Sequence, residues 1–223
     1  MPKPRNSGTG KITAEMVARA ALELLNEVGL DGLTMRQVAA RLNVQAAALY
    51  WHVENKRQLL DAMATTMYID AVEGMEAPRR GESWQQWVIV WATRLRRTLL
   101  RYRDGARVFA GTATDDAAVY RTTELILRTL QDAGFSLRDA ARGFPVVLHY
   151  VIGFTIEEQA RMGLDYGNDN PYRPGHLASS IDSQRFPLTA QAHPDLFAAD
   201  TDTPFTDGLH VILTGLRSTY LSE

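Results

Sequence analysis

Apolar residues recur at steps of three and four along most of this chain, and that spacing limits its fold more than any other feature. Between Val17 and Val28 the apolar residues fall on one side of a helix. The same period returns in several later segments, and none shows the apolar–polar alternation of a β-strand. The sequence therefore predicts an all-α fold built from amphipathic helices, each of which must bury an apolar face.

Caps and breakers divide this pattern into separate helices. Thr34, Asn55 and Ser83 each precede a periodic segment and have Gln three positions later, the spacing of a capping box. Pro145 should kink the helix that contains it, because proline removes one backbone N–H and crowds the preceding turn. The expected helices are 14–28, 35–42, 45–51, 56–75, 83–99, 115–132, 136–162 and 205–221, with a short segment at 105–110.

The helical period is lost between Gly163 and Pro204, where Gly, Pro, Asn, Asp and Ser predominate. Only a short helical piece near residues 192–199 is expected there. Loops of this length are usually functional or disordered, so the pattern leaves the role of this segment open.

Composition excludes several classes of protein. The 223 residues include no Cys, which rules out a disulfide scaffold, cysteine-ligated zinc and a thiolate nucleophile. No apolar run approaches the ~18 residues of a membrane span, and the first residues lack the apolar core of a signal peptide. We therefore expect a cytoplasmic protein with no membrane partner.

The formal net charge of -2 hides an uneven distribution. Residues 1–57 carry eight basic and five acidic groups, a net charge of +3, which leaves -5 for the remainder. A basic segment ahead of an acidic body indicates a polyanionic partner more strongly than the overall charge does.

Residues 13–57 have the pattern of a helix-turn-helix, in which one short helix enters the major groove of DNA. A longer helix precedes two short ones, and Asn43 can adopt the left-handed conformation that ends the first of these. Asn55 and Lys56 follow where backbone N–H groups and a cation would meet a phosphate. An ordinary helical bundle with a solvated basic face would give a similar pattern.

Eight motifs spread over both parts of the chain are specific in combination. They are Ala21–Gly29, Asp31–Arg36, Leu49–Val53, Asn55–Arg57, Gly81–Gln85, Tyr102–Ala106, Gly134–Asp139 and Gly208–Leu209. The first four resemble the DNA-binding domain of the tetracycline-repressor (TetR) family, and the others resemble the body of the tetracycline repressors. Residues 163–204 have no clear counterpart.

The resemblance implies a ligand-responsive regulator, most simply a repressor, that binds a palindromic operator as a homodimer. The long kinked helix and the terminal helix would form a four-helix dimer interface. Their apolar faces give a reason for this apart from the resemblance, because an apolar helix face is unfavourable unless another surface buries it. Two-fold symmetry places the half-sites about one helical turn, ~34 Å, apart. We expect a DNA-binding domain at 1–57, a connecting helix and hinge at 58–80, and a regulatory ligand-binding and dimerisation domain at 81–223.

The third helix should carry the contacts that read DNA. By resemblance, bases and phosphates are held by Arg36, Tyr50, Trp51, His52 and Lys56. Where the tetracycline repressors present polar or proline side chains, this chain has Ala46, Ala47 and Ala48. Alanine can touch a thymine methyl but forms no side-chain hydrogen bond, which predicts a different operator, read by Gln45, Arg36 and methyl contacts. Plain helix propensity explains the alanines equally well.

The magnesium-tetracycline site of the resembling repressors is not preserved in the sequence. Phe109 stands where they have a magnesium-ligating histidine, and Ile126 replaces a glutamine. Of the polar set only Thr112 and a glutamate near Glu157 remain, too few for an octahedral oxygen-rich site. We therefore expect no metal ligands and no cofactor.

The substitutions favour a pocket for a flat, hydrophobic effector. The candidate ligand-binding residues are Tyr68, Trp91, Leu95, Phe109, Thr112, Ile126, Phe144, Leu148 and His149. Each aromatic residue could equally fill the core. His149 could be a satisfied core histidine, and Glu157 and Glu158 an ordinary solvated pair.

Two other functions compete with ligand sensing. A small helical hydrolase would need a catalytic group, but the five histidines lack metal-ligand spacing and Ser179 and Ser180 beside His176 lack an orienting partner. The sequence therefore favours a protein that is not an enzyme. The other rival is a DNA-binding dimer with no small-molecule effector.

Overall fold

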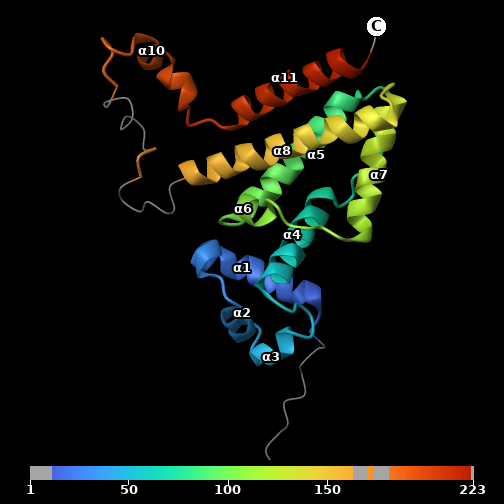
Figure 1. Ribbon diagram of the computed structural model, residues 1–223, viewed down its shortest axis with the longest axis vertical. Coiled ribbons are helices and arrows are strands. Elements are labelled where there is room, and N and C mark those ends of the chain that lie inside the picture. Colours follow the sequence, from blue (N-terminus) through green and yellow to red (C-terminus); the bar gives the residue numbers. More distant parts are fainter. Residues whose placement is uncertain (1–11, 163–169, 173–180, 222–223) are drawn as a thin grey trace, which may run out of the picture.

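The computed structural model describes residues 12–162, 170–172 and 181–221 of the chain. Over these residues the secondary structure consists of ten α-helices and no β-strand, which confirms the all-α prediction. Figure 1 shows a small N-terminal group of helices, the head, joined by one helix to a larger body of long helices. No helix among the described residues is long and apolar enough to cross a membrane.

Three helices form the head: α1 (Ala14–Gly32), α2 (Met35–Arg41) and α3 (Ala46–Leu49). The Thr34 hydroxyl caps α2 by accepting a hydrogen bond from the Gln37 N–H at 3.3 Å, as its position predicted. Asn43 has a left-handed φ of 54° between α2 and α3. Helix α3 is shorter than expected because Tyr50 already ends it.

The first helix has a break inside it. Gly29 adopts a φ of 69°, a left-handed value that favours glycine. The sequence placed the helix end at this glycine, but the chain returns to helical geometry for one further turn, so that α1 ends at Gly32. That last turn contacts the body, as described below.

Helix α4 (Lys56–Val72) connects the head to the body. The Asn55 side chain caps it by accepting a hydrogen bond from the Gln58 N–H at 3.0 Å. It packs along α1, where the Arg19 guanidinium binds both carboxylate oxygens of Asp70 at 3.1 and 3.2 Å. The helix ends three residues earlier than expected, before Gly74, whose φ is 66°.

The body contains α5 (Trp84–Leu100), α6 (Gly105–Phe109), α7 (Ala117–Asp132) and α8 (Leu137–Arg161). The capping box of α5 is complete, because Ser83 and Gln86 each bind the other's backbone N–H. Helix α8 runs without interruption through Pro145. Its buried side packs against α5, so that Trp91 and Val147 lie in one apolar core with Leu25 of the head and Leu59 of α4.

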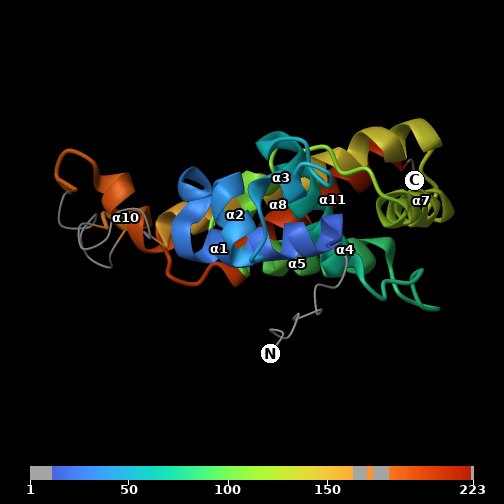
Figure 2. The ribbon, with the colours of Figure 1, turned by 90° about the horizontal axis from the view of Figure 1, so that it is seen from below.

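Two helices follow the long irregular segment. Helix α10 (Pro187–Leu196) begins and ends earlier than the helical piece expected at 192–199, and it starts with Pro187 at a position that favours proline. It has no buried residue and stands apart at one end of the molecule in Figures 1 and 2. Helix α11 (Asp202–Tyr220) lies along α8 and buries Phe205, Leu209 and Leu213.

Candidate nucleic-acid interface and effector site

The residues that follow α3 present two large aromatic side chains to solvent. Trp51 is 89% exposed and Tyr50 is 49% exposed. Neighbouring Leu49 is fully buried and anchors α3 in the head. Exposure of two aromatic side chains beside a buried anchor has no packing benefit, so these residues are available to contact a partner surface.

Most of the remaining predicted DNA-contacting residues lie in or beside α3, whereas Arg36 lies near the start of α2. Arg36, Gln45 and Ala47 are exposed, whereas Ala46, Ala48 and His52 are half-buried. Gln45 precedes α3 without capping it through its side chain. The three alanines therefore do not form a uniform exposed surface, and only Ala47 is fully accessible for a methyl contact.

Lys56 has a partner within the chain. Its ammonium donates a hydrogen bond to the Leu30 carbonyl oxygen at 3.2 Å. It is nevertheless exposed, so that a phosphate could approach it from solvent. The sequence pointed to the phosphate role of Lys56 but not to this contact with α1.

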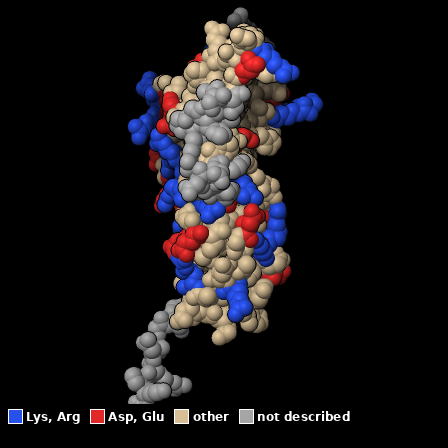
Figure 3. All heavy atoms as spheres, turned by 90° about the vertical axis from the view of Figure 1, so that its left-hand side faces the viewer, with Lys and Arg blue, Asp and Glu red and all other residues tan. Residues whose placement is uncertain are grey.

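Charge is mixed on the face shown in Figure 3. Basic and acidic side chains are interspersed there over both head and body. The difference in net charge between the two parts of the sequence therefore does not produce a continuous basic patch on this face.

Most of the predicted effector residues form a largely buried cluster from α4, α5, α6, α7 and α8. The Tyr68 and Phe109 rings stack with centroids 6.2 Å apart, and the Trp91 and Phe144 rings meet edge-on at 4.7 Å. Leu95 and Ile126 are also buried, and Leu148 is half-buried. Burial raises the pKa of Tyr68, although the nearby Trp91 indole partly offsets this.

One polar atom of this cluster has no hydrogen-bond partner. Trp91 is 1% exposed, and its indole Nε1 is buried and unpaired. The Tyr68 hydroxyl lies near it, but the two do not meet hydrogen-bond geometry. A buried N–H without an acceptor is unfavourable, commonly by about 1–3 kcal/mol, so this atom calls for an explanation.

His149 does not belong to this cluster. It is exposed on α8, so it neither lines the buried cluster nor fills the core. Helical spacing explains the error, because a residue one position after Leu148 points away from the face that packs on α5. Thr112 is half-buried, and its hydroxyl donates to the Phe109 carbonyl at 2.7 Å.

The residues at the place of the magnesium site do not fit a divalent cation. Phe109 offers no ligand atom, and Glu157 is exposed. Glu158 is buried, and both of its carboxylate oxygens bind Arg96, so it is not the solvated residue that the sequence suggested. Among the described residues, no three acidic or histidine side chains gather as a metal site would require.

Arg96 is the buried residue that sequence reasoning missed. The residue is 3% exposed, and its guanidinium lies over the Phe205 ring, 4.7 Å from the centroid. It also binds Asp202 at 2.6 Å and the Thr201 hydroxyl at 3.0 Å. The network joins α5, α8 and the start of α11. An arginine within an amphipathic helix gives no sequence signal that separates a buried position from a solvated one.

Helix α4 is tied to the segment that follows the aromatic cluster. The Arg57 guanidinium donates to the Gly111 carbonyl, and the Asp61 carboxylate accepts from the Ala113 N–H at 3.0 Å. Both partners lie just after Phe109. A change at the cluster can therefore reach the N-terminal half of α4, which begins in the head.

Two family models match most of the chain. Residues 17–63 match the model described as bacterial regulatory proteins, tetR family. Residues 77–220 match the tetracyclin repressor-like, C-terminal domain. Together with the helix-turn-helix head, these matches define a DNA-binding transcription regulator and not an enzyme.

Individual relatives agree over nearly the full length. The chain is 39% identical to the tetracycline repressor protein class D of Escherichia coli, over 93% of this chain and 90% of that protein. It is similar to a possible TetR family transcriptional regulator from Streptomyces coelicolor A3(2), with a TM-score of 0.82 and 36% identity over 92% of this chain and 99% of the other. It is also similar to ActR of Streptomyces coelicolor in complex with actinorhodin, with a TM-score of 0.80 and 27% identity over 96% and 99%.

The chain belongs to the TetR family of transcription regulators. Regulators of this family bind DNA operators and small-molecule effectors, and they form dimers.

Proposed function

We propose that the chain is a homodimeric repressor whose operator differs from the tetracycline operator and which is released by a flat, hydrophobic effector without magnesium. In this proposal the chain has a DNA-binding domain at 1–57, a connecting helix and hinge at 58–80, and a regulatory domain at 81–223. The observation that carries the effector class is the buried, unpaired indole N–H of Trp91 within an aromatic cluster.

The chemistry of the cluster defines the effector. Tyr68, Phe109 and Phe144 offer ring faces and edges, which suit a planar apolar molecule. The Trp91 N–H needs an acceptor, so the effector should carry a carbonyl or a similar oxygen at one edge. The Tyr68 hydroxyl nearby would add a second polar contact, and few such contacts are enough to orient a ligand in an apolar pocket.

Release from DNA would pass through α4. An effector that moves Phe109 shifts the segment at Gly111 and Ala113, to which Arg57 and Asp61 of α4 are bonded. A small rotation of α4 then changes the distance between the two α3 helices of a dimer. A preference of a few kcal/mol for the released conformation is sufficient.

The operator contacts follow from the exposed residues of the head. Tyr50, Trp51 and Arg36 would contact the DNA backbone and base edges, and Gln45 with Ala47 would read the major groove. A dimer would pair exposed apolar residues of α8 and α11, such as Val146 and Val211, which are 46% and 73% exposed.

A two-stage experiment tests the proposal. The operator is first selected from random DNA with the full-length protein, and compounds are then screened for release of that operator with and without EDTA. We expect a palindrome distinct from the tetracycline operator and release by a planar apolar compound that EDTA does not affect. Selection of the tetracycline operator contradicts the operator proposal, and release that EDTA abolishes contradicts the effector proposal.

A variant pair separates ligand recognition from core damage. Trp91→Phe removes the unpaired N–H but keeps an aromatic ring, so it should weaken the response to the effector while operator binding persists. Trp84→Phe is the control, because Trp84 is the first residue of α5, away from the cluster around Trp91, and packs edge-on against Phe135. If no compound releases the operator from the wild-type protein, the chain is a DNA-binding dimer without an effector.

A further inference from the structure

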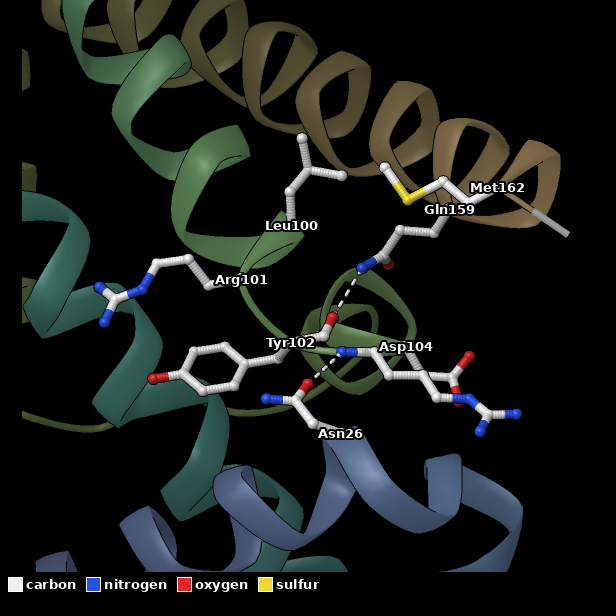
Figure 4. A pocket seen from close by; sticks show the side chains of 8 residues that line it. Asn26, Leu100, Arg101, Tyr102, Asp104, Gln159 and Met162 are labelled. Atoms are coloured by element: carbon white, nitrogen blue, oxygen red, sulfur yellow. Dashed lines mark hydrogen bonds between the residues drawn. The ribbon is translucent and has the colours of Figure 1, made fainter. Parts of the chain in front are cut away.

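We propose that Gln159, near the end of α8, is a positioning residue that sets the orientation of the head through the turn at residues 100–107. This inference rests on the DNA-binding function of the family and concerns a connection separate from the bonds that join α4 to Gly111 and Ala113. Figure 4 shows the turn between the end of α8 and α1.

The Gln159 amide holds the turn from the body side with both of its polar atoms. Its Nε2 donates to the carbonyl oxygens of Tyr102 at 2.8 Å and Leu99 at 3.2 Å. Its Oε1 accepts from the Ala106 N–H at 3.1 Å. One side chain therefore fixes the end of α5 and the start of α6 relative to α8.

Two hydrogen bonds hold the opposite side of the turn to α1. The Arg103 N–H donates to the Asn26 Oδ1 at 2.7 Å. The Leu30 N–H, in the last turn of α1, donates to the Asp104 carboxylate at 2.8 Å. The turn is thus bonded to the body on one side and to α1 on the other.

The turn is stiff enough to transmit a displacement. Asp104 has a left-handed φ of 57°, and a Cβ on Gly105 would lie 2.2 Å from the Leu99 carbonyl oxygen. Backbone packed this closely has little room to bend internally. Movement of Gln159 should therefore shift Arg103 and Asp104 together.

Hydrogen bonds, rather than apolar packing, set the orientation of α1 relative to the turn. A cavity of about 220 Å³ lies beside the turn and is lined by Asn26, Tyr102, Gln159 and Met162, among others. Where packing leaves such a space, directional bonds determine which of several orientations α1 adopts. Loss of either set of bonds should let the head reorient without unfolding the body.

A double-mutant cycle tests the proposal by operator affinity. Gln159→Leu removes the hydrogen bonds between α8 and the turn and keeps a side chain of similar size. Asn26→Ala removes the hydrogen bond between α1 and the Arg103 N–H. The probe is the operator duplex selected with the wild-type protein. We expect each variant to weaken operator binding by about fivefold. The double variant should be little weaker than either single variant, because both act on the same turn.

Controls separate positioning from general stability. Asn26→Asp keeps the acceptor for the Arg103 N–H, and Glu157→Gln changes an exposed neighbour on α8; both should bind the operator as the wild type does. Gln159→Leu leaves the Ala106 N–H without its acceptor, so its thermal midpoint should fall, whereas its dimer content should stay unchanged. Operator affinity is therefore measured well below that midpoint. Unchanged operator affinity there, or effects that multiply in the double variant, would each overturn the proposal. Failure of the wild type to bind DNA would instead refute the regulatory function.

Discussion

Arg96 and Glu158 form a bidentate ion pair in the interior of the body, with the guanidinium Nε and Nη2 each 2.7 Å from a carboxylate oxygen. Burial alone lowers the pKa of Arg96, but the hydrogen bonds that it donates to Glu158 and Asp202 outweigh this and raise that pKa above its usual value. The arginine therefore stays charged, and its position depends on Glu158.

Glu158→Ala should destabilise the protein strongly. The change leaves a charged guanidinium buried without its main partner, for which a loss of about 3–5 kcal/mol is typical. Urea unfolding followed by circular dichroism measures the free energy of unfolding. Glu157→Ala is the matched control, because Glu157 is exposed on the same helix and its loss should cost no more than about 0.5 kcal/mol. Equal stability of the two variants would contradict this account.

Trp51→Ala should reduce operator affinity without reducing stability. The side chain is 89% exposed, so its removal leaves the core intact, whereas removal of a side chain that binds DNA typically costs about 1–3 kcal/mol of binding free energy. Fluorescence anisotropy with the selected operator measures the affinity. Leu49→Ala, at a fully buried neighbour, should instead lower the free energy of unfolding by about 2–5 kcal/mol. A Trp51→Ala protein with wild-type affinity would remove Trp51 from the interface.

Asp70→Asn should loosen the packing between α1 and α4. Hydrogen bonds that Arg19 donates to Asp70 and then to Glu15 raise the pKa of Arg19 above its usual value, so the guanidinium stays charged. The Arg19 side chain is 46% exposed, which limits the expected loss of stability to about 1 kcal/mol. Glu15→Gln removes the other, more exposed partner and should have a smaller effect. Hydrogen exchange of α1 amides would detect the difference, and equal exchange in the two variants would refute it.

Stability should decrease at high pH in part because of Tyr68. Burial raises its pKa above the usual value, so the folded state disfavours the phenolate. The stabilising contribution is complete below the unfolded pKa of about 10 and is lost as the pH rises through the folded pKa. Urea unfolding at several pH values above 10 should show a shallower decline for Tyr68→Phe than for the wild type. Identical slopes would mean that Tyr68 ionises freely in the folded protein.

Local signals predicted the helices and their caps well. Thr34, Asn55 and Ser83 all cap the helices that they precede, because a cap depends on residues only three positions apart. The effector cluster was also predictable in outline, since Tyr68, Trp91 and Phe109 lie on apolar helix faces. The roles of these residues in binding remain predictions.

Features that depend on long-range contacts were not predictable. Arg96 reaches Glu158 and Asp202 through the fold, and no short-range pattern marks an arginine as buried. His149 and Leu148 are adjacent in the sequence but differ in exposure, because helix rotation decides which of the two faces the core. The extra turn of α1 after Gly29 is fixed by Asp104, 74 residues from Leu30.

The last turn of α1 brings two distant parts of the protein to a single residue. The Leu30 N–H is held by Asp104 of the body, and the Leu30 carbonyl oxygen is held by Lys56 at the start of α4. Only the two soft backbone torsions of one residue separate these two hydrogen bonds. Leu30 therefore links the two parts rigidly. If the Asp104 carboxylate is displaced, either the Lys56 ammonium moves with it or one of the two hydrogen bonds breaks.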